Sequence, residues 1–127
     1  VQAIGGRLAF TIRRLVERPA RFAGGYAVPL GDGTVIGATM EAGGLVAEAS
    51  DLQDALLRRA QQALGLQEIG PVEWRSGVRG ATADGLPLSG EVLPGLHLAL
   101  APRRNGWLMA PALAAQTVAG IEGRQTG

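Results

Sequence analysis

The sequence predicts an α+β fold with a largely antiparallel sheet and two main helices. Short segments in which apolar and polar residues alternate are separated by glycine-rich turns, a pattern typical of antiparallel strands. Two longer segments carry apolar residues suited to helices. Strands joined by tight turns and followed by helices favour α+β over a helical bundle. The 20 glycines among 127 residues agree with many turns.

The first 40 residues predict three strands. Alternation predicts a strand over residues 7–13, and the segment 17–20, which contains Pro19, predicts a loop. Residues 26–30 and 34–39 predict two strands joined by a hairpin turn at residues 31–33. The expected apolar faces of the first two strands consist of Leu8, Phe10 and Ile12, and of Tyr26, Val28 and Leu30.

A helix is predicted over residues 51–64, and we expect it to cover one face of the sheet. Ser50 and Gln53 predict a capping box, and Gly65 predicts the end of the helix. Asp54 and Arg58 have the spacing of an ion pair on the outer face. The apolar stripe consists of Leu52, Leu56, Ala60 and Leu64.

The last third of the chain predicts two more strands and a second helix. Residues 72–80 predict a strand that carries Arg79, and residues 87–90 predict a rigid, irregular segment. After a turn at residues 94–95, the alternating leucines of residues 96–100 predict a buried strand, with His97 in a structural role on its other face. The apolar run over residues 107–121 predicts the second helix.

Composition excludes several classes of site. All twelve basic residues are arginine, so lysine chemistry is excluded, and the absence of cysteine excludes disulfides and thiolate sites. His97 is the single histidine, which argues against a metal site or a Ser-His-Asp triad. Twelve basic residues against eleven acidic ones argue against a nucleic-acid partner. No apolar run reaches membrane-spanning length.

The segment 102–111 combines features of an anion-binding site. Arg103 and Arg104 precede Asn105, a favoured N-cap, and Gly106 permits close approach of the backbone to a ligand. The free N–H groups of a helix start attract anionic or electron-rich groups. Pro111 would forfeit a hydrogen bond, so we expect the helix to kink or to begin after Asn105. A surface loop with solvated arginines explains the segment equally well.

Three segments follow one another in a specific order. The first joins Tyr-Ala-Val-Pro at 26–29 with Gly-Ala-Thr-Met at 37–40. The second joins Gly-Val-Arg at 77–79 with Thr-Ala-Asp-Gly-Leu-Pro-Leu-Ser-Gly at 82–90, and the third runs from Arg-Asn-Gly at 104–106 to Pro111. Together they resemble the C-terminal part of the FAD-dependent glycine oxidase and D-amino-acid oxidase family, and they are most similar to its glycine oxidase branch.

The resemblance implies a substrate site for a small carboxylate-bearing amine. Arg79 matches the arginine that binds the substrate carboxylate, a role that suits the paired donors of a guanidinium. Tyr26 and Met40 match residues that line the pocket, and Arg104 matches a second arginine near substrate and flavin. No side chain is assigned as a catalytic acid or base, and no metal is expected.

The resemblance also implies FAD as the cofactor. The backbone of residues 102–108 would follow the flavin ring, with its N–H groups toward the end where negative charge gathers on reduction. The implied contact residues are Pro102, Arg103, Arg104, Asn105, Gly106, Trp107 and Leu108. The sequence departs from the family at residues 101–102, where Ala-Pro replaces Gly-His, and at residues 4–7, where Ile-Gly-Gly-Arg replaces a commoner Arg-Gly-Gln.

The resemblance implies two portions. Residues 1–78 match part of a substrate domain, and residues 79–127 match the segment that returns to the flavin-binding domain. The family's N-terminal dinucleotide-binding domain is not found in this sequence, so we expect the chain to be a C-terminal piece whose main partner is that domain. Alone, it should bind FAD weakly or not at all. Its apolar second helix should drive association into a homo-oligomer.

The function expected from the resemblance is oxidation of a small amino acid or amine by hydride transfer to FAD, with oxygen as acceptor. The alternative is a non-catalytic domain that binds a carboxylate ligand or serves as an accessory module. The absence of a signal-peptide layout predicts a cytoplasmic location.

Overall fold

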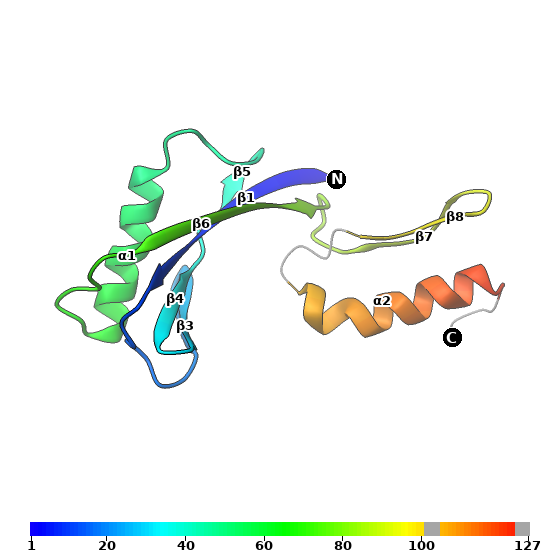
Figure 1. Cartoon of the computed structure of the whole chain (residues 1–127). Coiled ribbons are helices and arrows are strands. Elements are labelled where there is room, and N and C mark those ends of the chain that lie inside the picture. Colours follow the sequence, from blue (N-terminus) through cyan, green and yellow to red (C-terminus); the bar gives the residue numbers. More distant parts are fainter. Residues whose placement is uncertain (101–104, 124–127) are drawn as a thin grey trace. The chain divides into compact units, whose positions relative to one another are not determined.

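The computed structural model describes residues 1–100 and 105–123 and divides into two compact units. The sheet unit comprises Ile4–Val78, and the hairpin unit comprises Val1–Ala3 with Arg79–Gly127. The sheet unit holds an antiparallel sheet and one helix, whereas the hairpin unit holds a two-stranded hairpin and the other helix (Figure 1). The predicted α+β class is therefore confirmed.

The main sheet has six strands. Its order is β2-β3-β4-β1-β5, and β6 also pairs with β1. The hairpin predicted in the first 40 residues is present, because Leu30 pairs with Gly33 across a turn in which Gly31 has a positive φ of 57°. The strands are β1 (Gln2–Thr11), β2 (Ala20–Phe22), β3 (Gly25–Leu30), β4 (Gly33–Gly37), β5 (Glu41–Ala42) and β6 (Glu73–Ala81).

Helix α1 (Ser50–Leu64) packs on one face of this sheet and closes the core. Its buried Leu56 and Ala60 meet three fully buried strand residues, Ala9, Ala27 and Ile36. Strand residues alternate between faces, so the apolar faces predicted from Leu8 and Tyr26 lie on the side away from α1. Ile12 lies beyond the end of β1 and is 82% exposed, so its predicted place on an apolar strand face is wrong.

The ends of α1 correct one prediction and confirm another. The N-cap is Ala49, which has no side-chain cap, so the capping box predicted from Ser50 is wrong. Ala49 is buried, and the helix begins at Ser50 itself, which removes this serine from the capping position. Gly65 adopts the left-handed conformation and ends the helix, as predicted. Asp54 and Arg58 form no ion pair among the residues that the structure describes.

The hairpin unit contains β7 (Leu88–Leu93), β8 (Leu96–Leu100) and α2 (Gly106–Ile121). The irregular segment predicted at residues 87–90 is wrong, because antiparallel pairing with β8 draws it into a strand. Strand β8 is also less buried than predicted, with Leu96 47% exposed. Helix α2 begins directly after Asn105 and includes Pro111. Within the described residues, no helix is long and apolar enough to cross a membrane.

Candidate functional site

Tyr26 lies in a niche created by a missing side chain. The sheet register places Gly37 between Tyr26 of β3 and Leu8 of β1. A Cβ atom on Gly37 would overlap both the phenol ring of Tyr26 and the side chain of Leu8. The glycine therefore lets the tyrosine ring lie flat on β4, on the face of the sheet away from α1.

Met40 follows at the end of the same segment. Its side chain is exposed, whereas those of its neighbours Thr39 and Glu41 are buried. Tyr26 and Met40 thus both belong to the sheet unit and are linked by the short stretch that begins at Gly37.

Glu41 is the most heavily bonded carboxylate among the described residues. It accepts hydrogen bonds from Arg7 Nε at 3.1 Å and Arg7 Nη2 at 3.3 Å. It also accepts from Thr39 Oγ1 at 2.8 Å and from the Val46 N–H at 2.9 Å. The Glu41 side chain is fully buried, and that of Arg7 is 18% exposed.

The charge of Glu41 is stabilised by these contacts. Burial alone would raise the pKa of the Glu41 carboxyl. The hydrogen bonds and the positive charge of Arg7 outweigh burial and hold this pKa below its ordinary value of 4.5. The Glu41 carboxylate is therefore ionised at neutral pH, where it pairs with the guanidinium of Arg7.

Arg79 stands on β6, at the start of the hairpin unit, and is half-buried. Within the described part of the chain its guanidinium forms no ion pair. Asp84, which lies in the turn after β6, accepts a hydrogen bond from the Leu86 N–H at 3.0 Å. That bond lowers the pKa of Asp84. The positive charge of Arg79 thus has no carboxylate to neutralise it among the described residues.

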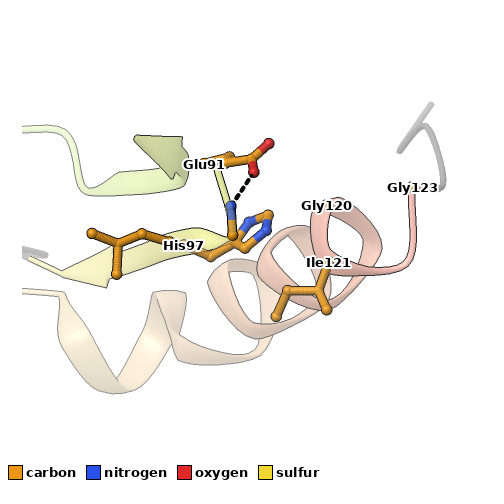
Figure 2. A pocket seen from close by; sticks show the side chains of 7 residues that line it. Glu91, His97, Gly120, Ile121 and Gly123 are labelled. Atoms are coloured by element: carbon orange, nitrogen blue, oxygen red, sulfur yellow. Dashed lines mark hydrogen bonds between the residues drawn. The ribbon is translucent and has the colours of Figure 1, made fainter. Parts of the chain in front are cut away.

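The hairpin unit also contains a hollow of about 640 Å³, which none of the predicted site residues lines. It lies between the turn of the β7–β8 hairpin and the last turn of α2 (Figure 2). Glu91 accepts a hydrogen bond from the Gly95 N–H at 2.7 Å and so closes the hairpin turn. His97 packs against Gly120, and its buried Nδ1 has no hydrogen-bond partner among the described residues.

Comparison with known proteins identifies the family. The model of the FAD dependent oxidoreductase family, DAO, matches residues 5–119. The chain belongs to this family. It is also 35% identical, over 95% of its length, to the tRNA 5-methylaminomethyl-2-thiouridine biosynthesis bifunctional protein MnmC of a Caulobacter species, of which it spans 22%.

Solved structures place the chain near the glycine oxidases of this FAD-dependent family. Glycine oxidase from Geobacillus kaustophilus matches 98% of the chain with a TM-score of 0.79 and 29% identity. Glycine oxidase from Bacillus cereus matches 98% with a TM-score of 0.75 and 27% identity. The chain spans 36% and 37% of these two enzymes. The predicted resemblance to the glycine oxidase branch is therefore confirmed.

The start of α2 is compatible with the FAD that defines this oxidoreductase family. Asn105 occupies the N-cap without a side-chain cap, and the first turn holds no acidic residue. Among the described residues no side chain caps the first N–H groups of the helix, an arrangement that suits an electron-rich ring edge. Trp107 is 99% exposed and Leu108 is 80% exposed. Three further predicted contacts, Pro102, Arg103 and Arg104, lie outside the described residues.

The structure shows contacts beside the candidate site residues that the sequence did not reveal. Arg7 and Glu41 are 34 residues apart in the chain, so no local sequence pattern predicts their contact. Arg21 was assigned to no strand, yet it pairs directly opposite Tyr26 on β2. Residues so placed have neighbouring side chains on one face of the sheet. In the sequence, only the Gly-Ala-Thr-Met motif at 37–40 had indicated that Gly37 and Thr39 lie near the candidate site.

Proposed function

We propose that this chain forms the carboxylate-binding and flavin-contacting part of an FAD-dependent oxidase of a small amino acid or related amine. Family membership and the glycine oxidase matches support this function. The unpaired charge of Arg79, a half-buried residue, is the observation that carries it, since no acid among the described residues pairs with Arg79. A substrate carboxylate would supply the missing partner through two parallel hydrogen bonds.

The other site residues have complementary roles in this proposal. Tyr26 donates its hydroxyl hydrogen bond to the substrate carboxylate, Met40 supplies an apolar wall, and Arg104 adds a second positive charge. In this proposal residues 105–108 would lie along the flavin ring, and the first N–H groups of α2 would stabilise negative charge at its edge. When bound, FAD would supply hydride acceptance from the α-carbon of the amine, and oxygen would be the final acceptor. The proposed location is the cytoplasm.

The Arg79→Lys substitution tests the proposal. Lysine keeps the positive charge but cannot offer two planar donors, and the loss of a charge-assisted hydrogen bond costs about 1.5–3 kcal/mol. We therefore expect kcat/KM for a carboxylate-bearing amine to fall about ten- to a hundred-fold in the native flavin-loaded protein. Steady-state kinetics with a melting curve measure both effects.

A matched control lies on the same strand. Arg75 is exposed and pairs with Glu73 at 3.1 Å, so Arg75→Lys should leave kcat/KM within about twofold of wild type. If Arg79→Lys loses thermal stability but its folded fraction keeps normal kinetics, Arg79 is structural and the proposed role is wrong.

A second candidate substrate is an amine attached to tRNA. The match to MnmC, whose name places it in the biosynthesis of an aminomethyl-thiouridine of tRNA, is the observation that favours this candidate. Arg21, exposed and opposite Tyr26, would contact a backbone phosphate in this case. Turnover of tRNA-linked amine but not of glycine would select this candidate over the first.

The non-catalytic alternative predicts a different purified protein. An accessory domain that binds a carboxylate ligand would be colourless, whereas the enzyme would be yellow from bound FAD. The visible spectrum of the native protein distinguishes them.

A further inference from the structure

Met40 is bracketed by a hydrogen-bonded cluster that we call the Glu41 clamp: Arg7, Thr39, Glu41 and Val46. Thr39 and Glu41, the two neighbours of Met40, are buried and bond to each other, whereas the Met40 side chain is 45% exposed. The backbone of Met40 is thus anchored on both sides while its side chain stays free of the cluster.

The clamp ties this segment to β1 and to the loop that follows β5. The Thr39 hydroxyl accepts from the Arg7 N–H at 2.9 Å, and the Thr39 N–H donates to the Arg7 carbonyl at 3.2 Å. On the other side, Val46 donates its N–H to Glu41 and accepts from Arg7 Nη2 at 2.5 Å. The Arg7 backbone and the Glu41 carboxylate therefore hold Thr39 before Met40, and the side chains of Arg7 and Glu41 hold Val46 after it.

A gain in folding stability does not by itself explain the Glu41 clamp. A buried ion pair loses hydration roughly equal to the attraction it gains, and apolar residues of similar volume often stabilise a fold as well. Its distinct property is geometric, because several directional hydrogen bonds converge on one carboxylate. The clamp is thus suited to hold one backbone position within narrow limits.

We propose that Arg7, Thr39 and Glu41 are positioning residues that fix Met40 as a rigid wall and restrict the substrate to amines with a very small side chain at the α-carbon. This inference rests on the proposed function, since it takes Met40 as part of the substrate pocket. A Met40 side chain held in place would clash with a large substituent on the α-carbon of the substrate, whereas a mobile Met40 would move aside.

The test compares two probes, glycine and D-valine, in the native flavin-loaded protein. Thr39→Val keeps the shape of the side chain but removes its hydrogen bonds, and Glu41→Gln removes the ion pair. We expect both variants to lower the ratio of kcat/KM for glycine over D-valine by about tenfold, the discrimination that one or two methylene groups provide. Thr39→Ser keeps the hydroxyl, so this variant should have the same ratio of kcat/KM for glycine over D-valine as wild type.

Glu48→Gln is the matched control. Glu48 is an exposed carboxylate in the same loop region with no ion pair among the described residues, so its ratio should equal that of wild type. A role confined to stability would reduce turnover of both probes in proportion to the folded fraction. An unchanged ratio in Thr39→Val and Glu41→Gln would therefore overturn the proposal.

A second measurement does not depend on turnover. The order parameter of the Met40 amide in the 127-residue chain should be about 0.85 in wild type and should fall below about 0.6 in Thr39→Val. A rigid amide in the variant would overturn the clamp itself. If wild type oxidised neither probe while the amide loosened as expected, the proposed function would fail and the anchoring of Met40 would stand.

Discussion

Gly37 illustrates how the candidate site depends on a single missing methyl group. A Cβ atom at this position would meet the Tyr26 ring on one side and Leu8 on the other. Gly37→Ala should therefore displace the tyrosine ring and lower the free energy of unfolding by about 1–3 kcal/mol, the usual cost of overpacking. Chemical denaturation measures the loss, and weaker inhibition by a small carboxylate would report the displaced ring.

Gly77→Ala serves as the control for Gly37→Ala. Gly77 is exposed on β6, and a Cβ atom there would meet nothing within 4 Å. Its unfolding free energy should change by less than about 1 kcal/mol. Equal losses in the two variants would contradict a specific niche for Tyr26.

Glu41 makes stability depend on pH in a defined direction. Its pKa in the folded chain lies below the ordinary value of 4.5, so near that pH the folded state binds fewer protons than the unfolded state. The stabilisation is complete above pH 4.5 and is lost as the pH falls through the lower folded pKa. Urea denaturation between pH 7 and pH 3 should show a steeper loss for wild type than for Glu41→Gln. Parallel pH profiles would show that Glu41 contributes no such linkage.

Helix α1 is the element on which the sheet unit depends. Leu56 is fully buried against the sheet, so Leu56→Ala should lower the free energy of unfolding by about 2–5 kcal/mol. Leu52 belongs to the same predicted stripe but is 39% exposed, so Leu52→Ala should cost clearly less. Thermal or chemical denaturation of both variants checks the order. A larger loss from Leu52→Ala would mean that the helix packs through a different face.

At the scale of the whole molecule, exposed apolar side chains predict association. Trp107 and Leu108 at the start of α2 are almost fully exposed, and Ile121 at its other end is 62% exposed. Surfaces of this kind promote contacts between molecules. We expect the 127-residue chain to sediment as concentration-dependent oligomers, and Trp107→Ser with Leu108→Ser to shift it toward monomer. Val1→Ser, at another exposed apolar residue, should have little effect. A strictly monomeric wild type at high concentration would refute this expectation.

Local patterns determined much of this protein before any tertiary contact was known. The hairpin at residues 31–33, the extent of α1 and its end at Gly65 follow from interactions within a few residues, so the sequence predicts them. The ordered motifs that contain Tyr26, Met40 and Arg79 likewise identify the oxidoreductase family, because their spacing along the chain is itself the signal.

Tertiary structure decided which faces are buried and which distant residues meet. Alternation along β1 and β3 predicted apolar faces that contain Leu8 and Tyr26, but α1 packs over the opposite face, where the small side chains of Ala9 and Ala27 permit its close approach. The strands at residues 20–22 and 88–93 form because a partner strand satisfies their backbone groups, which local propensity does not register. The pair of Arg7 and Glu41 exists only because the fold brings β1 beside β5, and no periodicity encodes a contact between strands so far apart in the chain.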